Sequence, residues 1–93
     1  MRIFKNKSFA RFARKARLED SALREAVANV ERGLIDADLG GGVVRQRIAR
    51  AGAGKSGGFR TIILFRAETR AFFVYGFAKS GQDNIWDDEL AAF

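Results

Sequence analysis

The spacing of apolar residues in this chain changes at a glycine-rich segment, and that change restricts the folds available to it. Before residue 36, apolar side chains recur three and four residues apart. After residue 42, the chain contains continuous runs rich in β-branched and aromatic residues. The first spacing is that of an amphipathic helix, and the second is typical of strands. Helices followed by strands predict an α+β fold, with the helices packed on one face of an antiparallel sheet.

Two helices are expected before the change of spacing. The first should begin near Ser8, and its apolar face would be formed by Phe9, Phe12, Ala13 and Ala16. The second should have Asp20 or Ser21 as its N-cap, extend its apolar face to Leu34, and have Gly33 at its C-terminal end. Two helices joined by a short polar turn are expected to form a helical hairpin.

The segment Asp36–Gly42 is expected to break regular structure, and three strands are expected after it. They are predicted at Val43–Ile48, Phe59–Phe65 and Ala71–Phe77, with Met1–Phe4 as an edge strand. The last segment, Asp83–Phe93, is expected to form a short C-terminal helix. A chain of 93 residues forms one compact domain more readily than two, so residues 1–93 are predicted to be a single domain.

The charge of the chain indicates an anionic partner. Lys and Arg number 17 and Asp and Glu 11, which gives a formal charge of +6 and a pI near 10.5. The basic residues gather near the N-terminus and in the strand region, whereas the charged residues after Lys79 are all acidic. An excess of this size and this segregation are typical of proteins that bind nucleic acid.

The absence of two residue types excludes several kinds of catalytic and metal site. The chain has no Cys and no His, which excludes disulfides, thiol catalysis and the commonest metal ligand. No metal site and no cofactor are therefore expected, and proton transfer is left to Lys, Arg, Tyr, Asp or Glu. No apolar segment is long enough to span a membrane or to act as a secretory signal, so a cytoplasmic location without a membrane partner is expected.

The basic residues of the strand region form the candidate site. Gly52–Gly57 fits the pattern G-x-G-x-x-G, but a strand rather than a helix is predicted after it, so a flexible basic loop carrying Lys55 is the preferred interpretation. Because side chains alternate along a strand, Arg45 and Arg47 share one face. Arg60 opens the next predicted strand and Lys79 closes the last one, so neighbouring strands could bring these cations together on one sheet surface.

An ordered set of segments is similar to a known family. The segments are Leu39–Ile48, Gly54–Ile62, Phe72–Ser80, Asn84-Ile85 and Glu89-Leu90. Together they resemble the HigB-like branch of the RelE/ParE superfamily, whose members are toxins of bacterial type II toxin–antitoxin systems. The resemblance implies a RelE-like microbial RNase fold, with two N-terminal helices on a twisted antiparallel sheet of three to four strands and a short C-terminal helix.

The resemblance also implies a function and a partner. It implies a ribosome-dependent mRNA endonuclease that inhibits translation by metal-independent cleavage through the RNA 2′-hydroxyl, neutralised by an antitoxin of the helix-turn-helix DNA-binding type. Arg60 would clamp the phosphate, and Lys79 or Lys55 would transfer the proton. RNA would be bound by Arg45, Arg47 and Arg50. Arg11, Arg14 and Lys15 would form a separate patch that docks on ribosomal RNA.

Two other functions remain open at this point. The ParE branch shares the fold but poisons DNA gyrase, which would produce DNA breaks while mRNA stays intact. A catalytically inactive module that binds RNA or the antitoxin would retain affinity for RNA without any cleavage.

Overall fold

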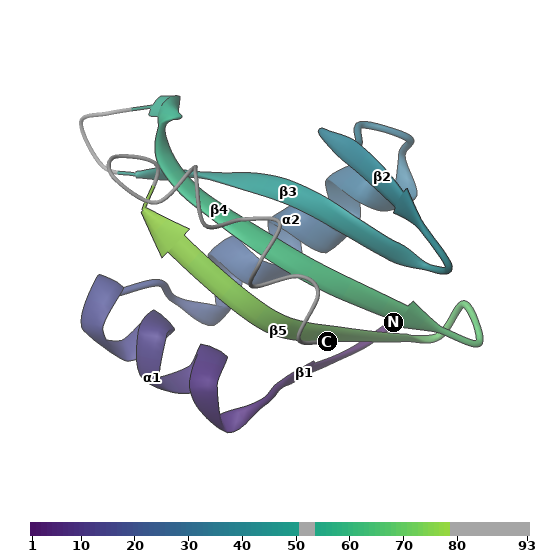
Figure 1. Ribbon diagram of the computed structural model, residues 1–93, viewed down its shortest axis with the longest axis horizontal. Helices are drawn as coiled ribbons and strands as arrows, with labels where there is room; N and C mark the ends of the chain where they lie inside the picture. Colours follow the sequence, from purple (N-terminus) through teal and green to yellow (C-terminus); the bar gives the residue numbers. More distant parts are fainter. Residues whose placement is uncertain (51–53, 79–93) are drawn as a thin grey trace.

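The computed structural model describes residues 1–50 and 54–78, and the side chains of residues 1–49 and 58–78. Helices α1 (Lys7–Ala16) and α2 (Asp20–Glu31) lie on one face of a sheet (Figure 1). The sheet consists of β1 (Arg2–Lys5), β2 (Ala37–Gly40), β3 (Val43–Arg50), β4 (Gly54–Arg66) and β5 (Arg70–Ala78). The predicted α+β class is confirmed, and the predicted C-terminal helix at Asp83–Phe93 lies outside the described residues.

The sheet has more strands than the sequence indicated. Its five strands follow the order β1-β5-β4-β3-β2. The extra strand is β2, which lies within the segment expected to break regular structure and pairs with β3 through Ala37 and Asp38. Its four residues are mostly exposed and contain no apolar run, so the sequence carries no strand pattern there. Glycines 40–42 have positive φ and turn the chain back into β3.

The sheet is mixed rather than wholly antiparallel. The predicted N-terminal edge strand is confirmed as β1, but β1 pairs with β5 in the parallel direction, with Ile3 opposite Ala71 and Phe4 opposite Phe72. A parallel pair cannot be joined by a tight turn and needs a long connection. Here the connection includes both helices and the other three strands, so nothing in the local sequence sets the direction of this pairing.

The two helices begin in different ways. Asn6 caps α1 as its side-chain oxygen accepts a hydrogen bond from the Phe9 amide at 2.7 Å. For α2 the predicted cap at Asp20 or Ser21 is wrong, because Glu19 holds the cap position without a side-chain hydrogen bond. Asp20 begins the helix and accepts a bond from Lys5 Nζ of β1 at 3.1 Å instead.

The end of α2 is partly as expected. The helix ends at Glu31, and Gly33 turns the chain with a φ of +84°, as its position after the helix predicted. Leu34 was expected on the apolar face, but it follows this turn and is 59% exposed. Because the chain turns at Gly33, Leu34 is no longer part of the helix and does not lie on its apolar face.

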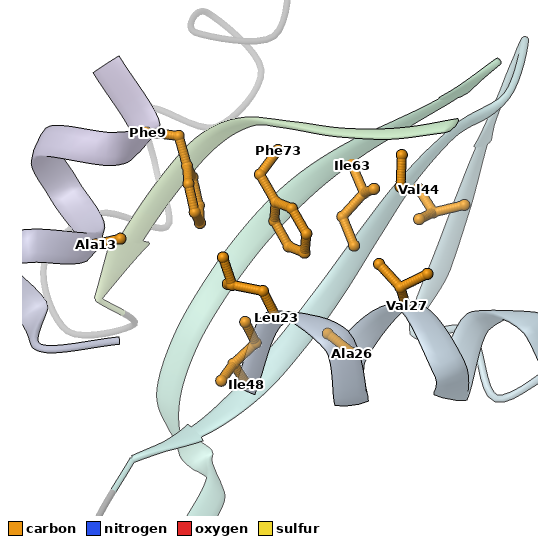
Figure 2. Packing of buried hydrophobic residues seen from close by; sticks show 10 residues of the cluster. Phe9, Ala13, Leu23, Ala26, Val27, Val44, Ile48, Ile63 and Phe73 are labelled. Carbon is orange, nitrogen blue, oxygen red and sulfur yellow. The ribbon is translucent and has the colours of Figure 1, made fainter. Parts of the chain in front are cut away.

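The core lies between the helices and the sheet (Figure 2). The residues that build it are Phe9 and Ala13 of α1, Leu23, Ala26 and Val27 of α2, Val44 and Ile48 of β3, Ile63 of β4, and Ala71 and Phe73 of β5. Because alternate strand residues point to opposite faces, the residues directly next to these inward positions lie on the other face. We call that side, which bears Arg45, Arg47 and Arg60, the distal face.

Candidate nucleic-acid interface

Three arginines from two adjacent strands line one depression on the distal face. Val44 and Ile48 are buried against the helices, which places Arg45 and Arg47 on the distal side of β3. Arg60 of β4 is the register partner of Arg47 and therefore shares its face. With Asp36, the three arginines line a depression of about 230 Å³, which we call the arginine depression. The structure thus brings together three of the residues that the sequence singled out.

Asp36 holds Arg47 in a fixed orientation. Its Oδ1 accepts a hydrogen bond from Arg47 Nε at 3.1 Å and forms an ion pair with Arg47 Nη2 at 2.9 Å, and its Oδ2 accepts a hydrogen bond from the Arg47 backbone amide. A carboxylate in contact with two nitrogens of one guanidinium and with the amide of the same residue restricts the orientation of that guanidinium as well as its position. Arg47 therefore presents its remaining surface to the depression in a defined direction.

Asp36 is itself anchored by a buried amide. Gln46 is 3% exposed; its Oε1 accepts a bond from the Asp36 amide at 3.1 Å, and its Nε2 donates to the Leu34 carbonyl at 2.7 Å. These two bonds satisfy both ends of a side chain that the apolar face of β3 would otherwise leave without partners. The segment before β2 is thereby fixed to β3, and Asp36 is held beside Arg47.

Arg60 has a guanidinium nitrogen that finds no hydrogen-bond acceptor in the described part of the chain. Among the described residues its Nη1 has no hydrogen-bond partner, although it is shielded from solvent. Leaving a donor of this kind without a partner costs about 1–3 kcal/mol, and more when the group is charged. An anion in the arginine depression would supply the missing acceptor.

The electrostatic balance of the arginine depression is positive. Arg47 and Arg60 are direct cross-strand partners, an arrangement of like charges that destabilises a sheet. Among the residues that the structure describes, the lining comprises three guanidinium groups and the carboxylate of Asp36. Guanidinium groups bind phosphate oxygens in a planar, bidentate manner. The arginine depression can therefore hold a phosphate group and stabilise additional negative charge on it.

The structure leaves the other predicted site residues apart from this group or undescribed. Arg50 ends β3 and pairs through the backbone with Gly54, but the side chains of Arg50 and Lys55 are not described. Lys55 was expected in a flexible loop, which is wrong, because β4 begins at Gly54 and includes it. The pairing with β3 extends the strand beyond its apolar run. Lys79 lies outside the described residues.

The basic residues of α1 form a separate surface. Arg11, Arg14 and Lys15 are exposed, whereas Phe9 and Ala13 of the same helix are buried. Since α1 packs on the sheet face opposite the arginine depression, the two basic regions are on different sides of the molecule. The predicted separation of this patch from the strand arginines is in agreement with the structure.

Two residues of the site were missed by the sequence reasoning. Asp36 lies in a segment interpreted only as a breaker, and nothing in its neighbourhood indicates that its partner is Arg47 on β3. Gln46 carried a weak signal, because it is polar and lies between Val44 and Ile48 on the face predicted to be apolar. A polar residue at such a position is expected to have a specific hydrogen-bond role.

Comparison with known proteins agrees with this geometry at the level of a family. No curated protein matches the chain. None of the helices in the described ranges is long and apolar enough to cross a membrane. Over residues 1–93 the chain matches the family described as the RelE toxin of the RelE/RelB toxin–antitoxin system. The chain therefore belongs to the RelE toxin family.

Proposed function

We propose that this toxin is an endoribonuclease that cleaves mRNA on the ribosome and thereby inhibits translation. The observation that carries the proposal is the arginine depression, where Arg45, Arg47 and Arg60 surround a space large enough for a phosphate group. The Nη1 of Arg60, which has no hydrogen-bond partner within residues 1–50 and 54–78, provides a donor for that phosphate. Membership of the RelE toxin family supports the same function.

The mechanism uses the RNA's own nucleophile. The 2′-oxygen attacks the adjacent phosphorus, the bond to the 5′-oxygen of the next nucleotide breaks, and a proton passes from the 2′-hydroxyl to a base while the leaving oxygen gains one. Negative charge accumulates on the phosphate oxygens in the transition state. Guanidinium groups that are already in place stabilise this charge more strongly than that of the ground state, which lowers the barrier.

The residues have distinct proposed roles. Arg60 clamps the scissile phosphate, while Arg45 and Arg47 bind the same phosphate or its neighbour. Lys55 and Lys79 are proposed for proton transfer, because the chain has no His and Lys is among the side chains left for this role. Arg50 is proposed to bind RNA at the end of β3. Arg11, Arg14 and Lys15 are proposed to dock on ribosomal RNA.

The same proposal includes the family branch, the cellular location and the antitoxin partner. We place the chain in the HigB-like branch on its sequence motifs, as one domain over residues 1–93 that acts in the cytoplasm. Its antitoxin is proposed to be of the helix-turn-helix type, with acidic groups that complement the basic surface. Such electrostatic complementarity would accelerate association of the toxin with its antitoxin.

The test is inducible expression in bacteria with mapping of mRNA 5′ ends, with and without active translation. Wild-type chain is expected to arrest growth and to produce new 5′ ends only when translation is active. Arg60→Gln, which removes the proposed clamp, should abolish both effects, and Lys79→Ala should reduce them. Arg24→Gln on the exposed side of α2 makes the same change of charge and should leave both effects intact.

The alternatives give different results in this experiment. Gyrase-dependent DNA breaks with intact mRNA would show a ParE-like gyrase poison. Affinity for RNA without new 5′ ends would show an inactive binding module. Full cleavage by the Arg60→Gln variant would show that the arginine depression is not the active site.

A further inference from the structure

The distal face carries a second group of arginines on three adjacent strands. Arg66 of β4 is the register partner of Arg70 in β5, and Arg70 is the partner of Arg2 in β1. Their neighbours in sequence, Phe65, Ala71 and Ile3, pack against the core, so these arginines point to the distal side. We call Arg2, Arg66 and Arg70 the second arginine cluster.

This register is unfavourable for the sheet by itself. Like charges placed directly opposite on neighbouring strands are destabilising, and here three follow one another across the sheet. Among the described residues, ion pairs are formed by Lys5 and Arg47, and none is formed by the second arginine cluster. The nearest acid in sequence is Glu68, in the exposed turn between β4 and β5. The arrangement is therefore one that an external anion would stabilise.

An aromatic pair lies beside the second arginine cluster. Phe4 and Phe72 are register partners on the distal face, and their rings stack with centroids 4.9 Å apart and planes inclined by 17°. The Arg2 guanidinium carbon lies 5.2 Å from the centre of the Phe4 ring. Single-stranded RNA is bound by surfaces that combine cations for phosphates with flat aromatic or guanidinium groups for bases.

Strand β4 contributes one arginine to each group, Arg60 to the arginine depression and Arg66 to the second arginine cluster. Arg60 and Arg66 are six positions apart on the same face of β4, which corresponds to roughly 20 Å at the usual rise of a strand. Between them Val43, Ile62 and Leu64 line a groove of about 370 Å³ that also reaches Arg66. Figure 1 shows the start of β1 beside the turn that joins β4 to β5. An extended RNA strand covers this distance in a few nucleotides.

We propose that the second arginine cluster is a phosphate-binding subsite that holds the same RNA strand a few nucleotides away from the bond held at Arg60. This rests on the proposed function and adds a substrate-binding surface to it. RNA is favoured over an acidic protein because the cluster shares a face with the arginine depression, has a mostly apolar groove on that face leading to Arg66, and lies beside an aromatic stack. The subsite fixes the path of the strand across the sheet.

The experiment measures binding of 2′-O-methyl oligoribonucleotides, which cannot be cleaved through the 2′-hydroxyl, at about three and about ten nucleotides in length. The test variant is Arg66→Gln/Arg70→Gln. The matched control is Lys7→Gln/Arg24→Gln, which removes two exposed charges from the helices.

The test variant should bind the longer oligonucleotide about tenfold more weakly than the wild-type chain does. The slope of its log affinity against log salt concentration should become shallower by about 0.7 for each phosphate that the variant no longer binds. Its affinity for the shorter oligonucleotide should not change, because that oligonucleotide occupies the arginine depression without reaching the subsite.

Further variants separate the possible failures. Arg66→Lys/Arg70→Lys keeps the charges and should restore most of the affinity, which a loss caused by misfolding would not show. If the test variant weakened binding of both oligonucleotides equally, or if the control variant weakened binding as much as the test variant, the proposed subsite would be overturned. Loss of antitoxin binding with unchanged RNA binding would assign the second arginine cluster to the antitoxin and also overturn it. If Arg60→Gln instead cleaves mRNA as fully as the wild-type chain does, the proposed function of the arginine depression fails, and the binding data for the second arginine cluster are not affected.

Discussion

Asp36 introduces a negative charge into a depression otherwise lined by arginines. Its two hydrogen bonds and its ion pair with Arg47 show that it orients a cation, although its charge also opposes that of an incoming phosphate. Asp36→Asn should therefore slow cleavage by about tenfold, or about 1.4 kcal/mol of transition-state stabilisation. RNA affinity should stay equal or increase, because a repulsive charge is removed. Single-turnover cleavage of ribosome-bound mRNA, combined with binding of a 2′-O-methyl oligoribonucleotide, measures the two effects separately.

The control for Asp36 is Glu31→Gln, which removes an exposed carboxylate at the end of α2. It should change neither the rate nor the affinity. An unchanged rate in Asp36→Asn, or weaker RNA binding, would contradict the positioning role.

Gly76 is a residue whose missing side chain makes room for α1. A Cβ at this position would lie 2.5 Å from Phe12 Cε2 and 3.0 Å from Phe9 Cε1, and Phe9 is fully buried. Gly76→Ala should therefore reduce the free energy of unfolding by about 1–3 kcal/mol through overpacking. Urea denaturation measures the loss. Adding Phe12→Leu should recover part of it, whereas no recovery would locate the strain elsewhere.

At the scale of elements, Asn6 joins α1 to the sheet as well as capping it. Its Oδ1 accepts a bond from the Phe9 amide at 2.7 Å, while its Nδ2 donates to the Val74 carbonyl at 3.0 Å. Asn6→Ala loses both bonds and should lower the free energy of unfolding by about 1–2 kcal/mol, as measured by urea denaturation. Asn6→Asp keeps the cap acceptor and should lose less. Equal losses would show that the bond to Val74, and not the cap, is the important one.

The elements that the sequence predicted are those set by local pattern. The faces of α1 and β3 follow directly from apolar spacing, and both agree with the structure. β2 was missed because its strand conformation comes from pairing with β3 and from bonds such as Asp36 to Arg47, not from its own residues. The parallel direction of β1 also depends on the whole chain, since its partner β5 is separated from it by every other element.

At the scale of the whole molecule, predicting the site requires the register between strands, which the sequence does not give directly. Alternation placed Arg45 and Arg47 on one face, but their meeting with Arg60 depends on the pairing of Arg47 with Arg60. A shift of one residue would have moved Arg60 to the core side. The apolar neighbours Phe59 and Ile63, both buried against the helix side, fix the correct register. Asp36 could not be found in this way, since its role arises from a contact outside any regular pattern.

The core separates two basic surfaces, which should contribute to different steps. The arginine depression is on the distal face, whereas Arg11 and Arg14 are exposed on α1 on the other side. Charges remote from the reacting bond affect encounter and docking rather than the chemical step. Arg11→Gln/Arg14→Gln should therefore raise the ribosome concentration for half-maximal cleavage by about fivefold and leave the maximal rate unchanged.

Arg60→Gln should show the opposite behaviour in the same titration, with a much lower maximal rate at saturating ribosomes. The effect of the α1 variant should diminish as salt is added, because exposed charges are screened beyond about 10 Å at 0.1 M ionic strength. The effect of Arg60→Gln should persist, because Arg60 is partly buried and acts at the phosphate itself. The α1 variant could instead show a lower maximal rate with an unchanged ribosome concentration for half-maximal cleavage. That result would show that both surfaces act in the chemical step, and it would contradict the assignment of the two surfaces to different steps.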